Sequence, residues 1–311
     1  MMTYLRTALG ALVFLAIACH SKPPAKLIRT VAYKLASTEL ERINSRIEAA
    51  YSKGRVDSLL DLYDTACTYL PEYKATIYEK QDLRKFFTNW FKTDTIASYS
   101  KKIYSVEDID GYVLEIGTFV LTSSKNGVPA PAYAGKYMIM WKRYSSTSLK
   151  ILSEAFGSDK HVSPQDIPYA GVEVPDRRPL DSDDVSQALQ PAIEAFDSGV
   201  VKAVMTGDGA ARAAEFTADG IYMPHFDPMQ IGMEMLKPYM LKTYRPNNAF
   251  KYVKDTFREI FTTPAYVFLV GHFKVGFANG STTGSFEGNM VNLMKWNTAG
   301  QLLMYRQLAH N

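Results

Sequence analysis

Four side chains in the second half of the chain have the types and spacing that acid–base chemistry uses. His225 and Asp227 follow a predicted strand that ends at Pro224, and a histidine beside a carboxylate can act as a general base near neutral pH. His272 and Arg306 lie on two later predicted strands. If all four shared one interior, they could bind or activate an anionic or carbonyl ligand. The interpretation that we favour is simpler: His225 and Asp227 form a local hydrogen bond in a turn, and His272 faces outward.

Other chemistries have little support in the sequence. Two histidines and an aspartate suit a divalent metal, but no H-x-x-x-H or C-x-x-C spacing occurs, so no metal site is predicted. Without a G-x-G-x-x-G or Walker A motif, no cofactor is predicted either. Cys67 has no accompanying His or Asn pattern and is interpreted as a small buried residue. The net charge of +3, with no basic block, makes nucleic acid an unsuitable partner.

The start of the chain predicts export. Arg6 precedes the apolar run 8–18, which is too short to span a bilayer and suits the core of a signal peptide. The run ends at Cys19, and the five residues that end there resemble a bacterial lipobox, in which the cysteine is lipidated. The favoured leucine lies one place too early, however, and 16–18 is also an A-x-A site for ordinary signal cleavage.

We therefore predict a signal peptide over 1–19 and a polar, proline-containing tether over 20–38. The expected product is a membrane-anchored lipoprotein that faces the periplasm or the cell exterior, with an unlipidated exported protein as the alternative. The lipid is the only membrane contact expected, because no later run of about twenty apolar residues occurs.

The elements that must position the candidate residues occur twice. Gly54 to Pro71 indicates a short helix followed by a strand that stops at the proline, and Gly207 to Pro224 repeats the pattern 153 residues later. Helical spacing flanks each pattern, and Pro238 is expected to kink or split the third helix of the second copy. Period-two patterns then predict strands at 99–107, 112–123, 132–143 and 148–156, and at 249–261, 265–278, 284–296 and 301–309.

The offset of 153 is expected to hold without a gap to the end of the chain. It places His272 at the position of Phe119 and Arg306 at the position of Ser153. Residues 158–183 carry four prolines and are interpreted as a linker. The predicted organisation is a first domain over 39–157, the linker over 158–183 and a second domain over 184–311.

Three stretches narrow the fold. Gly54–Pro71, Ile116–Phe119 and Gly135–Arg143 together resemble the SnoaL-like, nuclear-transport-factor-2-like superfamily, above all its uncharacterised bacterial branch. The second copy matches more loosely, mainly through its register with the first. The resemblance implies an α+β fold with two tandem cone-shaped domains, each a curved, mostly antiparallel sheet wrapped around three helices. It also implies an apolar pocket at each open end, and domain–domain pairing or a homodimer.

The superfamily includes isomerases, cyclases and dehydratases as well as proteins without chemistry, so the resemblance does not settle function. The isomerases place an aspartate base just before the proline that ends the first strand. Here those positions hold Leu70 and Met223, which cannot take a proton. Aromatic and acidic residues near the expected cone mouths are the candidate pocket residues: Tyr69, Glu72, Tyr137, Trp141 and Tyr222.

Three functions follow as hypotheses. The leading one is binding of a small apolar or amphipathic ligand, or of a protein partner, without evident catalysis. The second is an enzyme of isomerase, dehydratase or hydrolase type that acts on a small carbonyl or hydroxyl compound in the second domain. The third is a structural interaction module formed by intramolecular pairing of the two domains.

Overall fold

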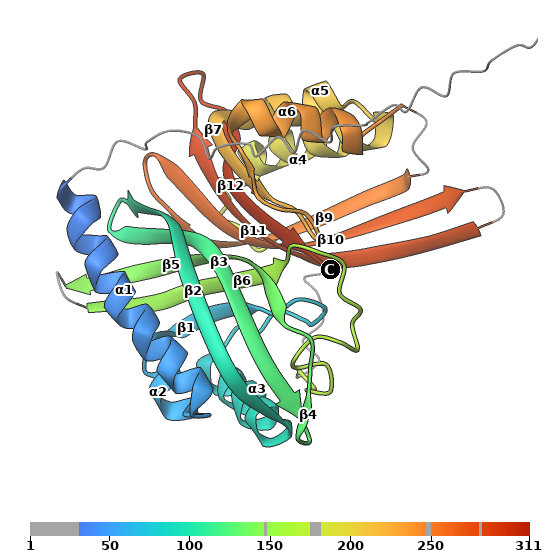
Figure 1. The fold of residues 1–311 in the computed structure, drawn as a ribbon. Coiled ribbons are helices and arrows are strands. Elements are labelled where there is room, and N and C mark those ends of the chain that lie inside the picture. The colour runs from blue at the N-terminus through green and yellow to red at the C-terminus, as the bar shows by residue number, and fades with distance from the viewer. Residues whose placement is uncertain (1–30, 146–147, 175–181, 247–249, 280–281) are drawn as a thin grey trace, which may run out of the picture.

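The computed structural model describes residues 31–145, 148–174, 182–246, 250–279 and 282–311. The predicted signal peptide, the lipidation site at Cys19 and residues 20–30 of the predicted tether lie outside these ranges. The α+β fold class is confirmed, because the described part of the chain forms two mixed sheets, each accompanied by three helices (Figure 1).

The first half forms a sheet with the strand order β1-β6-β5-β3-β2, in which β1 runs parallel to β6 and the remaining pairs are antiparallel. The short strand β4 pairs with β3. The elements are α1 (Val31–Ser52), α2 (Val56–Leu60), β1 (Tyr63–Leu70), α3 (Lys80–Thr93), β2 (Asp94–Ile109), β3 (Tyr112–Lys125), β4 (Val128–Pro129), β5 (Tyr133–Ser145) and β6 (Ser148–Ser158).

The second half repeats this topology with the strand order β8-β7-β12-β11-β10-β9, and β7 runs parallel to β12. The elements are α4 (Gln190–Thr206), α5 (Gly209–Ala214), β7 (Phe216–Met223), β8 (Gln230–Ile231), α6 (Gly232–Thr243), β9 (Phe250–Thr262), β10 (Tyr266–Asn279), β11 (Thr282–Trp296) and β12 (Leu302–His310). No helix in the described ranges is long and apolar enough to cross a membrane.

The eight long strands predicted from period-two patterns are all present. Pro238 is expected to kink or split a helix. It does not split α6, because this helix runs unbroken from Gly232 to Thr243. Proline removes one backbone donor. Leu236 and Met240, on either side of it, are fully buried, and their packing holds the helix on the sheet.

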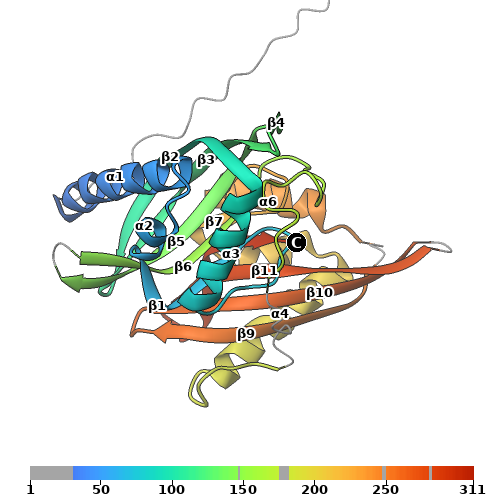
Figure 2. The ribbon, with the colours of Figure 1, turned by 90° about the horizontal axis from the view of Figure 1, so that it is seen from below.

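The two sheets face each other, and the helices lie outside them. Figure 1 shows α4, α5 and α6 on the outer side of the second sheet, and Figure 2 shows the first set of helices from below. Both faces of each sheet are therefore apolar. On β3, Val113 packs into the core beneath the first helices, whereas Leu114 and Ile116 point to the other sheet, as strand alternation requires.

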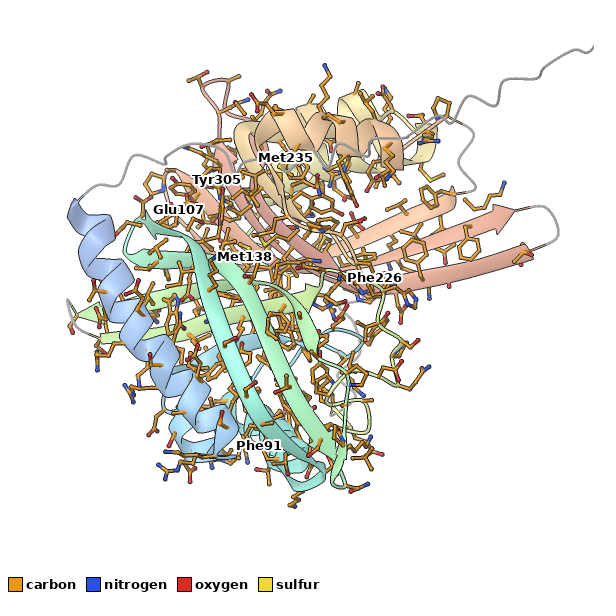
Figure 3. All side chains as sticks on the ribbon, viewed as in Figure 1. Phe91, Glu107, Met138, Phe226, Met235 and Tyr305 are labelled. Carbon is orange, nitrogen blue, oxygen red and sulfur yellow. The ribbon has the colours of Figure 1, made fainter. Side chains whose placement is uncertain are left out.

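The layer between the sheets is a continuous apolar core that joins the two halves. Met138, labelled in Figure 3, lies inside it, and the residues before the two prolines, Leu70 and Met223, belong to it as well. Leu70 and Met223 therefore face the opposite half of the molecule and not the interior of their own half. The other members include Ile109, Met140, Leu152, Ile221, Phe268, Val270, Val291, Leu293 and Leu308.

Equivalent residues of the two halves make reciprocal bonds across this layer. Lys136 Nζ donates to the backbone oxygen of Asp227 at 2.9 Å, and Asn289 Nδ2 donates to the backbone oxygen of Lys74 at 2.8 Å. Both the donors and the acceptors are 153 residues apart. The halves are thus related by an approximate two-fold axis, as in an isologous interface.

The offset of 153 does not hold for every strand. Tyr137 pairs with Gly117, and the equivalent residue Met290 pairs with Gly271. Tyr137 and Met290 are 153 residues apart, whereas the two glycines are 154 residues apart. A change of one residue moves a side chain to the opposite face of a sheet. The expectation of a gapless repeat is therefore wrong for β10, and His272 does not occupy the position of Phe119.

The segment that follows β6, within the predicted linker, packs on the first half. Ile167, Tyr169 and Val172 are buried in the core beneath α1 and α3. They lie against an aromatic cluster in which Tyr169 contacts Phe86 and Trp90. The described residues of this segment thus cover the interior of the first half.

Candidate functional site

The second half contains a cavity of about 220 Å³ between its helices and its sheet. Most of its wall is apolar, as in pockets that hold small molecules. The apolar lining consists of Phe196, Val200, Val204, Pro224, Phe250, Val253, Phe257, Phe273, Val275, Phe286, Met290 and Ala309, and the polar lining of Arg212, Tyr222, His225, Tyr239, Tyr244, Asp255, Asn292, Gln307 and Asn311.

Three buried polar side chains in the cavity wall form a hydrogen-bond chain. Arg212 Nη2 donates to Gln307 Oε1 at 3.1 Å, and Gln307 Nε2 donates to Asn292 Oδ1 at 2.9 Å. All three side chains are at most 5% exposed. Among the described residues, Asn292 Nδ2 and Arg212 Nε have no hydrogen-bond partner.

Local sequence positions this chain. Asp208 caps α5, because its side chain accepts from the backbone N–H of Ala210 and of Ala211 at 3.1 and 2.9 Å. The capped helix places Arg212 in the cavity wall, where its Nη1 donates to Glu215 Oε2 at 2.8 Å. The guanidinium charge is therefore compensated within the protein.

Carboxyl groups near the cavity hold protons more tightly than usual. Burial, together with the charge of the neighbouring Asp197, raises the pKa of Asp255 to about 8. Burial also raises the pKa of Asp197, and it raises the pKa of Glu215 to about 7 although Arg212 opposes the shift. This part of the interior therefore disfavours additional negative charge.

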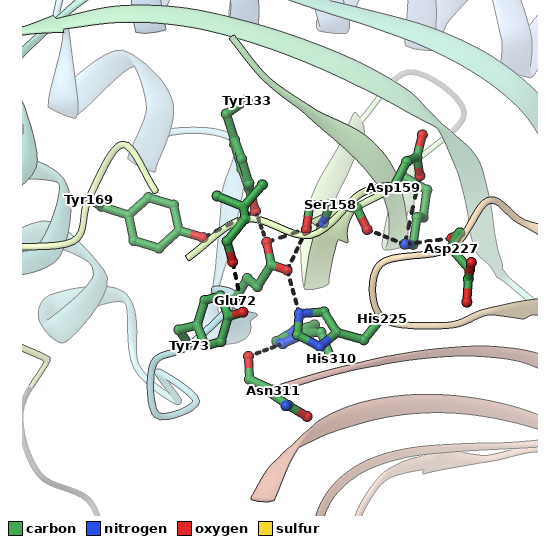
Figure 4. A network of polar contacts seen from close by, with 12 residues as sticks. Glu72, Tyr73, Tyr133, Ser158, Asp159, Tyr169, His225, Asp227, His310 and Asn311 are labelled. Carbon is green, nitrogen blue, oxygen red and sulfur yellow. Dashed lines mark hydrogen bonds and ion pairs between the residues drawn. The ribbon is translucent and has the colours of Figure 1, made fainter. Parts of the chain in front are cut away.

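Part of the cavity wall is held by a contact between the two halves. His225 lines the cavity, and its Nε2 lies 2.6 Å from Glu72 Oε1 of the first half. Glu72 is fully buried, and it also accepts from Tyr133 Oη and from the backbone N–H and hydroxyl of Ser158 (Figure 4).

These contacts decide the ionisation of Glu72. Burial alone would raise its pKa, but the hydrogen bonds from His225, Tyr133 and Ser158 outweigh burial and bring the pKa below its ordinary value. Glu72 is thus an ionised acceptor at neutral pH. Glu72 and His225 are 153 residues apart, so these two equivalent positions meet near the approximate two-fold axis.

The four candidates for acid–base chemistry do not share one space. His225 bonds to Glu72 and not to Asp227, whose Oδ2 accepts from Tyr239 at 3.0 Å, so the expected local turn bond is wrong. Arg306 lies between the sheets and pairs with Glu107 of the first half at 2.8 Å.

His272 is the fourth candidate for acid–base chemistry. It points away from the cavity on the face of β10 that bears Phe268 and Val270, and its nearest charged partner is Glu287 at 3.8 Å. His272 thus lies away from the interior of its own half, on the face of β10 that is directed toward the other sheet. The structure therefore does not bring His225, Asp227, His272 and Arg306 together in one space.

Among the described residues of the first half, aromatic side chains nearly fill the space where a pocket is expected. The residual space there is about 10 Å³, the room of roughly one water molecule, and eight aromatic or aliphatic side chains surround it. Tyr69 is buried among Tyr63, Phe86 and Phe156.

The other candidates in the first half are used internally. Tyr137 Oη and Trp141 Nε1 donate to the buried carboxylate of Glu115 at 2.7 and 3.0 Å, and Lys101 Nζ lies 3.2 Å from the same carboxylate. Glu72, also expected to lie near a pocket, meets the second half instead. Of the predicted pocket residues, only Tyr222 lines the large cavity.

Sequence reasoning missed the residues at the polar end of the cavity, Arg212, Asp255, Asn292 and Gln307. One signal for them exists in the sequence. Met290, Asn292 and Met294 alternate along a predicted strand, so the asparagine falls on a face that is otherwise apolar. Among the described residues, no group of three or more His, Cys, Asp or Glu side chains could hold a metal ion.

Comparisons with known proteins find solved structures that resemble parts of this chain. No protein-family model and no curated protein matches the chain. A ketosteroid isomerase-like protein from Erwinia carotovora atroseptica is 17% identical, with a TM-score of 0.34, over 40% of this chain and 97% of that protein. An NTF-2-like protein of unknown function from Shewanella oneidensis is 13% identical, with a TM-score of 0.33, over 39% and 98%.

A protein of unknown function from Mycobacterium tuberculosis is 10% identical, with a TM-score of 0.38, and the match covers 44% of this chain and 84% of that one. At such identities and TM-scores these likenesses carry no information about a ligand. The function must be argued from the cavity itself.

Proposed function

We propose that the second half binds a small amphipathic molecule in its cavity and that the first half supports the wall of that cavity through the contact of Glu72 with His225. The observation that carries this proposal is an apolar cavity of about 220 Å³ with a buried polar end, at the place where the first half is filled by aromatic side chains. Concave apolar space with a few polar groups is the usual form of a ligand site.

The proposed function is ligand binding without catalysis. The four side chains that could have supplied an acid, a base and an anion site do not converge: His225 bonds to Glu72, Arg306 pairs with Glu107, and His272 points away from the cavity. The two positions where superfamily isomerases carry a base are apolar and belong to the layer between the sheets.

The proposal includes export and a lipid anchor at Cys19, supported by the apolar run 8–18 and the lipobox-like residues that end at the cysteine. Mass spectrometry of the mature protein tests it. The expected result is an N-terminal cysteine that carries a lipid, and an unmodified Cys19 or a chain cleaved elsewhere would contradict the anchor.

Ligand binding is tested by thermal-shift screening of the purified protein against uncharged metabolites that are largely apolar. We expect some compounds to raise the unfolding temperature, because a ligand that binds only the folded state stabilises it. The matched control is Ala309→Phe, which places a large ring in the cavity wall and should abolish the shift while the protein stays folded. Equal shifts for both proteins would locate binding elsewhere and would contradict the proposal.

A further inference from the structure

The polar end of the cavity has a defined hydrogen-bond direction. We infer that the ligand carries a neutral carbonyl-type oxygen, to which Asn292 Nδ2 donates at the end of a chain of hydrogen bonds that starts at Arg212. This inference rests on the proposed function, because it specifies the chemistry of the molecule that the cavity binds.

The direction follows from donors and acceptors alone. A guanidinium has only N–H donors, so Gln307 must turn its oxygen toward Arg212, at 3.1 Å. The Gln307 amide nitrogen then faces Asn292 and donates to its Oδ1 at 2.9 Å. The oxygen of Asn292 thus accepts from Gln307, and the NH₂ group of Asn292 is turned away from Gln307 and is without a partner among the described residues.

That NH₂ group lacks a partner within the described residues, although Asn292 is only 1% exposed and lines the cavity. A buried donor without a partner costs about 1–3 kcal/mol. An acceptor oxygen on a bound ligand would remove that cost. Hydrogen bonds in a chain also polarise one another, so the positive charge of Arg212 makes Asn292 a stronger donor.

The surroundings favour a neutral acceptor over an anion. Glu215 already compensates Arg212 at 2.8 Å, and the carboxyl groups of Asp197 and Asp255 lie close to the same interior. Burial already raises the pKa of these carboxyl groups, so an added carboxylate or phosphate would be disfavoured in the same poorly solvated space. A ketone, ester or amide oxygen accepts the hydrogen bond without bringing a charge.

Apolar contacts hold the remainder of the molecule. Met290 shares the inner face of β11 with Asn292, and Phe257 and Phe273 belong to the same lining. The expected ligand therefore has an apolar body with a single carbonyl oxygen at its buried end.

The test uses three probes of similar size with the purified full-length protein. These are methyl 2-naphthyl ketone, its hydrocarbon isostere 2-isopropenylnaphthalene, and carbazole, which donates one N–H and has no acceptor oxygen. Titration calorimetry should show the ketone binding about tenfold more tightly than the hydrocarbon. Asn292→Leu should remove this preference and leave hydrocarbon binding within a factor of about three.

Gln307→Glu tests the direction of the chain. A glutamate accepts from both neighbours, so Asn292 should turn its NH₂ toward Glu at 307 and present its oxygen to the cavity. The ketone should then lose its advantage over the hydrocarbon, and carbazole should bind more tightly than in the unaltered protein. A retained ketone preference in a folded Gln307→Glu protein would overturn the inference, and if this variant fails to fold, Asn292→Leu decides alone.

The outcomes separate the inference from the proposed function. Equal affinities of the unaltered protein for the ketone and the hydrocarbon would overturn the inferred carbonyl recognition and leave ligand binding standing. Binding of none of the three probes would contradict ligand binding in this cavity, and the inference would fall with it.

Discussion

The two halves share a fold and differ in what occupies their interiors. Phe156 and Ala309 occupy equivalent positions, since they pair with the equivalent residues Tyr137 and Met290. The phenyl ring fills the first interior with its aromatic neighbours, and the alanine leaves the second one open. At this pair of equivalent positions, a large aromatic side chain accompanies a filled core and a small aliphatic one accompanies a cavity.

The polar groups differ in the same way. In the first half, the carboxylate of Glu115 receives hydrogen bonds from Asn44, Tyr137 and Trp141, and thus has no capacity left for a ligand. In the second half, the chain from Arg212 to Asn292 leaves Arg212 Nε and Asn292 Nδ2 without partners among the described residues. The comparison shows that a repeated topology does not imply a repeated interior.

The largest expected effect tests whether the first interior is a true core. Phe156→Ala should lower the free energy of unfolding by about 3–5 kcal/mol, because it removes a buried ring from a packed cluster and leaves a void. Urea denaturation measures this. Phe286→Ala, on the open cavity of the second half, is the matched control and should cost less than about 1 kcal/mol. Equal costs would mean that the halves do not differ in packing.

The next effect concerns the contact that joins the halves. Glu72→Gln keeps the size of the side chain and should cost about 1.5–3 kcal/mol, because charge-assisted hydrogen bonds from His225 and Tyr133 are lost. The pKa of Glu72 is lowered in the folded protein, so its contribution to stability is present above its ordinary pKa and is lost as the pH falls through the folded value.

Urea midpoints between pH 3 and pH 7 measure both features of Glu72. The unaltered protein should lose its advantage over Glu72→Gln at the acid end of this range. Glu287→Gln, which removes an exposed carboxylate beside a histidine, is the matched control and should change little. A constant difference across the range would contradict a stabilising ionised Glu72.

A smaller effect is expected from the acidic groups near the cavity. The pKa of Asp255 is raised to about 8, so between its ordinary pKa and pH 8 the folded protein holds a proton that the unfolded chain has released. The stability contribution of Asp255 is therefore full at low pH and is lost as the pH rises through 8.

Asp255→Asn should remove this loss. At pH 9 the variant should unfold about 3 °C or more above the unaltered protein, the shift that corresponds to roughly 1 kcal/mol, and at pH 5 it should show no such advantage. Thermal unfolding followed by circular dichroism measures the difference. A variant that is less stable at pH 9 would show that Asp255 is ionised without cost in the folded state.

The smallest effect tests the register of β10. His272→Ala should change the free energy of unfolding by less than about 0.5 kcal/mol and leave probe affinity unchanged, because His272 points away from the cavity. Titration of methyl 2-naphthyl ketone measures the affinity. A loss of affinity similar to that of Asn292→Leu would place His272 in the cavity and refute the offset of 154.

Much of the fold could be predicted because its signals are local and occur twice. Gly54 and Gly207 both have positive φ angles, and Gly207 ends α4 where a side chain would collide with the backbone of Arg245. The alternation of apolar residues predicted all eight long strands. The family resemblance remains a prediction, since the likenesses to solved structures are too weak to test it.

The site could not be predicted in the same way, because it depends on register and on contacts between distant residues. The shift of the offset from 153 to 154 in β10 reverses the face of His272. Glu72 reads as an exposed residue after a proline, whereas in the structure it is buried between Tyr133 and Ser158 of the first half and His225 of the second. The chain from Arg212 to Asn292 joins α5 to two strands that lie more than seventy residues further on.

The reciprocal bonds of Lys136 and Asn289 have a consequence for how such a site can arise. A symmetric homodimer encodes both interiors with the same residues, so filling one would fill the other. Two copies within one chain escape that constraint and meet at an effective concentration in the millimolar range, which makes their association independent of dilution. Covalent tandem duplication thus permits a division of labour in which one copy becomes scaffold and the other keeps an empty space.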